Sequence, residues 1–201
     1  QAEGYLLEVT SRGVLLMAKD FMGMQWGILR LKEAINIEEE YIPAFLIHDW
    51  PDLLWRGVHL PLPEESQLNA FKTFIIEIFL PYQFNTICLQ TDYNFQFGKH
   101  KELRTEQARS AGFCRELSSF LVDHGIRVIP AFNCLGHQSD AQANYPLLKA
   151  YPEFDETPHL SFGDKRLYRR SWCPRNRKLP PLLFDMWGDM VTAFESSYFH
   201  I

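Results

Sequence analysis

The chain has 201 residues, of which 46% are hydrophobic and 14% aromatic, and its 25 acidic and 20 basic side chains give a formal charge of -5. This composition predicts a globular protein with a hydrophobic core and excludes disordered, collagen-like and coiled-coil chains. The acidic balance argues against nucleic acid as a partner. No membrane span is expected, because charged residues such as Glu8 and Arg12 interrupt every apolar run before it reaches the roughly 20 residues required.

The cysteines give no sign of a metal site or a disulfide scaffold. Cys88, Cys114, Cys134 and Cys173 are too far apart for a CxxC motif and too few for a disulfide framework, so we predict mostly buried thiols. The chain also lacks an HxxxH motif and carboxylates clustered at ligand spacing. We therefore expect neither a bound metal nor a cofactor.

The first 45 residues predict a small α+β unit. Two apolar runs, Tyr5 to Val9 and Val14 to Ala18, flank a short segment that ends in Gly13, which is typical of a hairpin. Apolar residues then recur with a helical period from Phe21 to Ile35, after Asp20 as a plausible N-cap. The following triplet Glu38-Glu39-Glu40 is interpreted as a solvated acidic turn.

Strands alternate with helices in the rest of the chain, after an apolar stretch at 42–47 and a turn-like segment at 48–52. Strands are predicted at 57–60, 85–91 and 126–132, with a fourth beginning at 198; helices are predicted at 64–80, 105–124 and 181–194. This alternation predicts a parallel sheet covered by helices, either an open doubly wound sheet or a (β/α)8 barrel. The barrel is favoured because no glycine-rich phosphate-binding motif follows any strand.

We therefore expect an α/β fold: the end of an α+β domain at 1–45, then strands one to four of a (β/α)8 TIM-type barrel at 46–201. Both termini look cut, because a strand-like run follows Gln1 almost at once and another begins just before Ile201. The chain is thus expected to be a fragment.

Candidate site residues follow from the rule that active sites of parallel α/β folds lie at the carboxyl ends of the strands. Asp92 follows the second predicted strand, and His137 follows the third. Arg56 precedes the first strand and His59 lies within it. An aspartate and a histidine on adjacent strand ends can form a hydrogen-bonded pair that orients the imidazole. The alternative is that Asp92 caps the next segment and His137 is a structural histidine.

Several segments, taken in order, resemble the glycoside hydrolase family 20 β-N-acetylhexosaminidases. The segment from Pro51 to Gly57 is similar to that family's Pro-x-x-x-Trp-Arg-Gly entry to barrel strand one, and 85–92 resembles its Asn-x-x-x-x-x-x-Asp strand two. Gly125-Ile126-Arg127-Val128-Ile129-Pro130 with Gly136-His137 resembles the Gly-Ile-x-Val-Ile-Pro and Gly-His signature of strand three. The segment at 172–176 looks like the family's Cys-Pro-x-Asn loop, and the hairpin and helix at 3–34 match the end of its small domain.

This resemblance implies a glycosidase that removes terminal N-acetylhexosamine, GlcNAc or GalNAc, from glycans. In the family, the substrate's own acetamido carbonyl attacks the anomeric carbon, an aspartate orients it, and the adjacent glutamate acts as general acid and base, an exception to the two-carboxylate rule. That Asp-Glu pair follows barrel strand four, so it is expected just beyond Ile201. The resemblance also implies that Arg56 holds sugar hydroxyls and that Asp92 and His137 support the catalytic glutamate. The alternative for Arg56 is an ion pair at the edge of the core.

The chain departs from the family pattern where carboxylates are expected. Leu60-Pro61 replaces the aspartate after strand one, Tyr93 replaces the second acid after strand two, and Ala131-Phe132-Asn133 replaces a Glu-x-Asp segment. A missing acid removes hydrogen bonds and alters its neighbours. The rival interpretation is therefore a non-catalytic carbohydrate-binding or scaffold protein that keeps the fold.

Two weaker features remain open. Seven basic residues and no acid lie between Lys165 and Lys178, which is typical either of a solvated loop or of a surface for anionic glycans or phosphate. Five aromatic residues near the strand ends can either stack on sugar rings or pack in the core; they are Tyr93, Phe95, Phe97, Tyr145 and Tyr151.

Overall fold

The computed structural model describes residues 1–35 and 40–201. The chain divides into two compact units, one comprising residues 1–57 and 70–86 and the other residues 58–69 and 87–201. Glu38 and Glu39 of the predicted acidic turn lie outside the described residues.

The first unit contains an antiparallel sheet in the order β2-β1-β3, made of β1 (Tyr5–Thr10), β2 (Gly13–Ala18) and β3 (Phe45–Asp49). The predicted hairpin is confirmed, with Val9 paired to Val14. Residues 48 and 49, expected in a turn, instead extend β3, because Asp49 pairs with Tyr5 on the neighbouring strand β1. Because β3 belongs to this sheet, the first unit extends beyond residue 45.

Helix α1 (Phe21–Ala34) packs on this sheet through its small residues. Asp20 caps the helix, since its Oδ1 accepts the N–H of Gly23 at 2.9 Å. The buried residues are Gly23, Trp26 and Gly27, whereas Phe21 and Ile28, part of the apolar pattern that predicted the helix, are exposed. A Cβ on Gly23 would lie 2.4 Å from the backbone carbonyl oxygen of Gly4, so this close approach requires glycine.

The second sheet has the order β4-β5-β6, from β4 (Gly57–Pro61), β5 (Thr86–Gln90) and β6 (Arg127–Ala131). Hydrogen bonds join the start of β4 to the start of β5 and the end of β4 to the end of β5, which is the order of a parallel pair. Thr91 N likewise donates to Ala131 O, where β5 and β6 end. The three predicted strands are therefore present at the predicted places.

A fourth strand begins beside β6, and the sheet is curved. His200 forms a parallel bridge with Ala131, and its N–H donates to Pro130 O at 3.0 Å. The rings of His59 on β4 and His200 lie only 5.8 Å apart between centroids. Three strand spacings in a flat sheet would separate them by about 14 Å. The sheet thus curves with both rings on its concave face, as the wall of a barrel does.

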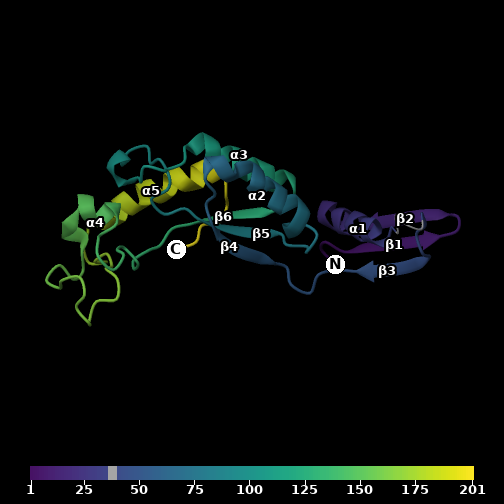
Figure 1. Cartoon of the computed structure of the whole chain (residues 1–201), viewed down its shortest axis with the longest axis horizontal. Helices are drawn as coiled ribbons and strands as arrows, with labels where there is room; N and C mark the ends of the chain where they lie inside the picture. Colours follow the sequence, from purple (N-terminus) through teal and green to yellow (C-terminus); the bar gives the residue numbers. More distant parts are fainter. Residues whose placement is uncertain (36–39) are drawn as a thin grey trace. The chain divides into compact units, whose positions relative to one another are not determined.

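Helices α3 (Ala111–Asp123) and α5 (Leu179–Phe194) contact each other and β6, and they lie on the same side of the sheet (Figure 1). The predicted inward residues Cys114, Leu117 and Leu121 of α3 are fully buried. Helix α3 begins at Ala111 rather than at 105, because Ser110 caps it by accepting the Phe113 N–H at 3.1 Å. The loops of this unit carry η3 (Lys101–Leu103), α4 (Pro146–Ala150) and η4 (Pro152–Phe154).

The predicted helix at 64–80 is present but changes geometry along its length. It begins as η1 (Glu65–Gln67), continues as α2 (Leu68–Phe74) and ends in the π-helical η2 (Ile75–Phe79). The wider turn is seen in the bond from Leu80 N to Ile75 O at 3.0 Å. No helix in the described part of the chain is both long and apolar enough to span a membrane.

Candidate functional site

The candidate site lies at the carboxyl edge of the second sheet. Strand β5 ends at Gln90, two residues before Asp92, and β6 ends at Ala131, shortly before Asn133 and His137. Because the strands are parallel, these residues are brought to one edge. Asp92 and His137 have left-handed backbone conformations, with φ of 44° and 55°. Such values are uncommon outside glycine and occur at turns and functional sites.

The carboxylate of Asp92 binds the neighbouring strand end. Its Oδ1 accepts the backbone N–H of Asn133 at 2.8 Å, and its Oδ2 accepts the side-chain amide of Asn133 at 3.2 Å. Oδ1 also accepts Gln90 Nε2 at 2.6 Å. These bonds tie the ends of β5 and β6 together and hold the carboxylate in one orientation. Asn133, which sequence analysis treated only as a departure, is therefore the principal partner of Asp92.

His137 lies on the same edge with an exposed side chain. Its ring contacts the ring of Tyr168 edge-on, with 6.1 Å between centroids. No hydrogen bond joins it to Asp92 within the described residues. The structure thus places both predicted residues on one edge, but it links Asp92 to Asn133 rather than to His137.

Arg56 makes its contacts within the first unit. Its guanidinium donates to Glu3 Oε2, to Gln83 O at 2.7 Å and to Leu53 O at 2.6 Å, and it lies 5.9 Å from the Trp26 ring centroid. Both side chains of the Arg56–Glu3 pair are 15% exposed. This environment matches the ion-pair alternative for Arg56.

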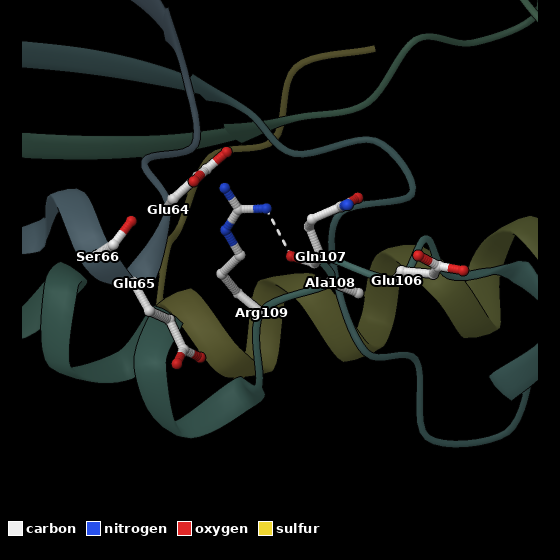
Figure 2. Close-up of a pocket in the computed structure, with 7 residues that line it drawn as sticks. All are labelled: Glu64, Glu65, Ser66, Glu106, Gln107, Ala108 and Arg109. Atoms are coloured by element: carbon white, nitrogen blue, oxygen red, sulfur yellow. Dashed lines mark hydrogen bonds between the residues drawn. The ribbon is translucent and has the colours of Figure 1, made fainter.

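A cavity of about 300 Å³ lies beyond the end of β4 (Figure 2). One wall is formed by Glu64, Glu65 and Ser66, and the other by the segment from Glu106 to Arg109. Sequence analysis did not select these residues. The available signal was the pair of acids directly after β4, at the carboxyl edge where sites are expected.

Arg109 connects the two walls of this cavity. Its side chain is buried, and its Nε donates to Pro63 O at 2.9 Å while the end of the guanidinium donates to Leu62 O and Gln107 O. In Figure 2 the guanidinium points toward Gln107, whereas Glu106 points away from it. With three carboxylates and one guanidinium along its lining, the cavity favours a neutral or cationic ligand over an anion.

Three of the aromatic residues near the strand ends belong to the core. Tyr93, Phe95 and Phe97 are at most 5% exposed. The hydroxyl of Tyr93 donates to Gln138 Oε1 at 2.5 Å, and burial raises the pKa of Tyr93 well above its usual value. These rings therefore pack in the core beside the strand ends and are not accessible to a ligand.

The basic segment from Lys165 to Lys178 is partly neutralised. Arg170 forms a buried ion pair with Asp155 at 2.6 Å, and Arg166 pairs with Asp164 at 2.7 Å on the surface. Among the described residues, no ion pair joins the other five cations of this segment to an acid. The segment thus has both a structural and a solvated part.

Thiols and acids form no metal cluster in the described ranges. All four cysteines are free, and the predicted burial holds fully only for Cys114, because Cys88, Cys134 and Cys173 are partly exposed. No group of three or more His, Cys, Asp or Glu side chains within residues 1–35 and 40–201 is arranged to hold a metal ion.

Comparison with protein-family models finds no match. Curated relatives do match: a β-hexosaminidase of Akkermansia muciniphila is 22% identical over all of this chain and 45% of its own length. A β-hexosaminidase of Porphyromonas gingivalis is 24% identical over 99% of this chain and 28% of its own length. The chain thus spans less than half the length of these relatives.

Solved structures share the fold. The chitobiase of Flavobacterium johnsoniae superposes with a TM-score of 0.80 at 21% identity, covering 99% of this chain and 31% of its own. A glycoside hydrolase family 20 β-N-acetylglucosaminidase gives 0.79 at 18% identity, covering 100% of this chain and 47% of its own. A Streptomyces plicatus β-hexosaminidase in complex with the product GlcNAc gives 0.75 at 16% identity, covering 98% and 44%. The predicted resemblance is confirmed: the relatives and structural neighbours that match along this chain are β-hexosaminidases, family 20 enzymes among them.

Proposed function

We propose that the chain is part of a glycosidase that removes terminal N-acetylhexosamine from glycans by the substrate-assisted retaining mechanism. The names of its relatives support a glycosidase activity, and the curved parallel sheet supports a barrel. In this proposal β4, β5, β6 and the strand that begins at His200 are strands one to four of the (β/α)8 barrel, and the antiparallel sheet of β1 to β3 with α1 belongs to the preceding α+β domain.

The arrangement of Asp92 carries the proposal. Its carboxylate lies at the carboxyl edge and is fixed by the backbone and side chain of Asn133. A carboxylate held rigidly at that edge can orient a catalytic group on the next strand, as supporting residues of active sites do. Asp92 is proposed as a positioning residue, with His137 as a second supporting residue on the same edge.

The acids that do the chemistry are proposed to lie outside this chain, after the strand that begins at His200. One carboxylate orients the substrate's acetamido group, and the adjacent acid first donates a proton to the leaving oxygen and then takes one from water. The residues of this chain contribute the first wall of the pocket and hold its supporting groups.

Two roles are proposed for Arg56, and its contacts favour one of them. The resemblance assigns it to the hydroxyls of the terminal sugar, but the guanidinium is engaged by Glu3 and two backbone carbonyls. We propose that its principal role is to stabilise the first unit. If an Arg56 variant lost sugar binding but kept its stability, the result would favour the sugar-binding role instead.

A non-catalytic carbohydrate-binding protein is the second candidate, and a specific observation favours it. Asn133 stands where the family pattern has an acid, and it holds Asp92 with an amide rather than a second carboxylate. Such a site can bind sugar hydroxyls without protonating a leaving group.

Hydrolysis of aryl N-acetyl-β-glucosaminide and N-acetyl-β-galactosaminide by the complete gene product separates the two candidates. The proposal predicts turnover that drops at least about 10²-fold when the Asp-Glu pair is changed to Asn-Gln. Binding of these sugars without turnover would select the carbohydrate-binding protein.

A further inference from the structure

A second cavity, distinct from the one beyond β4, lies beside His137. It measures about 240 Å³ and is enclosed between residues 139–141, which follow β6, and residues of the loop at 162–169. This is smaller than the roughly 300–1,000 Å³ of pockets for drug-sized ligands. The cavity therefore suits a single small ligand, such as one sugar ring.

Aromatic surface dominates one side of this cavity. Tyr168 is 78% exposed and Phe162 is 37% exposed, and both residues line the cavity. Arg169 lies over the Tyr168 ring at 5.0 Å and Arg170 lies over the Phe162 ring at 4.6 Å, so each ring has a cation near it. Aromatic faces of this kind offer apolar contact to the C–H surface of a sugar.

Polar groups of opposite charge complete the lining. Asp140 is held by the N–H groups of Gln142 and Ala143, both at 2.6 Å from its Oδ1, and these bonds lower the pKa of Asp140. Its second carboxylate oxygen can accept a hydrogen bond from a ligand. Arg169 supplies donors. The two charges offset each other, which argues against an anionic ligand and for neutral hydroxyl groups.

The buried side chain of Arg170 makes this lining rigid. Arg170 pairs with Asp155 and donates to Thr157 O at 2.8 Å and Leu160 O at 2.7 Å. Its backbone N–H donates to Ser139 Oγ, and its backbone carbonyl accepts from Gln138 N. Both walls of the cavity are thus tied to one buried residue, so the site is organised before a ligand binds.

From this geometry we infer that the cavity binds one neutral pyranose ring of a glycan, with Tyr168 and Phe162 contacting its face and Asp140 and Arg169 binding its hydroxyls. The Tyr168 ring contacts His137, which is a supporting residue in the proposed function, so the bound pyranose is assigned to the same glycan chain as the sugar at the proposed reaction centre. The inference thus deepens the proposed function and rests on it. Recognition of a glycan of two or more units follows, rather than of a lone terminal sugar.

Isothermal titration of the complete gene product with a thio-linked β-N-acetylglucosamine tetrasaccharide, which resists hydrolysis, tests this inference. Tyr168→Ala is expected to lower the affinity about tenfold, the scale of one lost aromatic contact, whereas Tyr168→Phe keeps the ring and the affinity. Tyr82→Ala serves as the matched control, because Tyr82 is similarly exposed at 73% but does not line the cavity. Equal affinity in the wild-type protein and in folded Tyr168→Ala and Arg169→Ala variants would overturn the inference.

A tetrasaccharide carrying 6-O-sulfate groups tests the neutral character of the ligand. It is expected to bind no more tightly than the neutral tetrasaccharide. Tighter binding that is lost in Arg169→Ala would overturn the neutral assignment. Failure of the proposed function gives a different result, because a protein without turnover can still bind the tetrasaccharide through Tyr168. An active enzyme whose affinity for the tetrasaccharide does not depend on Tyr168 would refute only the assignment of this cavity.

Discussion

Glu3 and Arg56, which are 53 positions apart in the sequence, form an ion pair whose side chains are each 15% exposed. Glu3 also accepts hydrogen bonds from Trp26 Nε1 at 2.9 Å and Asn85 Nδ2 at 2.7 Å. One carboxylate therefore joins the first residues of the chain to α1, to the segment before β4 and to the segment before β5. All three guanidinium nitrogens of Arg56 are engaged in this arrangement, which leaves two of its five N–H groups for a sugar hydroxyl.

Replacing Glu3 is expected to destabilise the first unit. Glu3→Ala leaves Arg56, Trp26 and Asn85 without their common acceptor, which should cost about 2 kcal/mol or more. Glu33→Ala, which breaks the exposed pair with Arg30, should cost at most about 0.5 kcal/mol. Denaturant midpoints followed by circular dichroism compare the two variants. Equal small effects would mean that Glu3 does not organise the unit.

Two helical glycines are expected to respond oppositely to alanine. Gly23→Ala in α1 places a methyl group 2.4 Å from the backbone carbonyl oxygen of Gly4, so we expect a loss of about 1–3 kcal/mol from overpacking. Gly188→Ala in α5 meets nothing within 4 Å, so helix propensity should stabilise it by about 0.5–1 kcal/mol. Thermal denaturation measures both, and a Gly23→Ala protein as stable as the wild type would contradict the close packing.

Helix α1 shows how far the sequence alone could predict the fold. The apolar period from Phe21 to Ile35 predicted the helix, yet the residues that pack are Gly23, Trp26 and Gly27. A helical period in the sequence shows only how apolar residues are spaced. The close packing of α1 depends instead on glycines, which have no side chain, and no hydrophobicity pattern reveals them. Similarly, residues 48 and 49 lie in a strand because of long-range pairing with β1.

The candidate site was predictable only in part, for a related reason. The alternation of strands and helices located Asp92 and His137 at one edge of the sheet. It did not reveal that Asn133 binds Asp92, because that pairing depends on backbone direction after two different strands. The cavity lined by Glu64 and Arg109 likewise joins loops that are distant in sequence.

The thiol of Cys114 is expected to be the least reactive of the four cysteines. Burial raises its pKa to about 12, so very little thiolate forms at neutral pH, and the side chain is fully buried. Cys88 and Cys134 also have raised pKa values, but they are only partly buried. Mass spectrometry after iodoacetamide treatment at about pH 8 should find Cys114 modified last. Early modification of Cys114 in folded protein would contradict its burial.

Asn133→Asp is expected to make stability depend on pH. It places a second carboxylate where an amide now lies 3.2 Å from Asp92 Oδ2, and repulsion should raise the pKa of one of the two acids above its unfolded value. The folded state then loses about 1–2 kcal/mol at pH 7, where both acids are ionised. This loss shrinks as the pH falls through the raised pKa, because protonation is then favoured in the folded state.

Asn133→Ala provides the control for this experiment. It removes the same amide without adding a charge, so its loss of stability should stay constant between about pH 4 and pH 7. Denaturant titrations at several pH values compare the variants. Parallel pH profiles for Asn133→Asp and Asn133→Ala would show that Asp92 does not face residue 133.

Hydrolysis of aryl N-acetyl-β-glucosaminide, measured side by side for the complete gene product and for residues 1–201 alone, tests the central claim most directly. The proposal predicts turnover by the complete protein and none by the shorter chain, because the acid that protonates the leaving group is proposed to follow Ile201. Turnover at the same rate by residues 1–201, or a folded complete protein inert toward both N-acetylglucosaminide and N-acetylgalactosaminide, would contradict it.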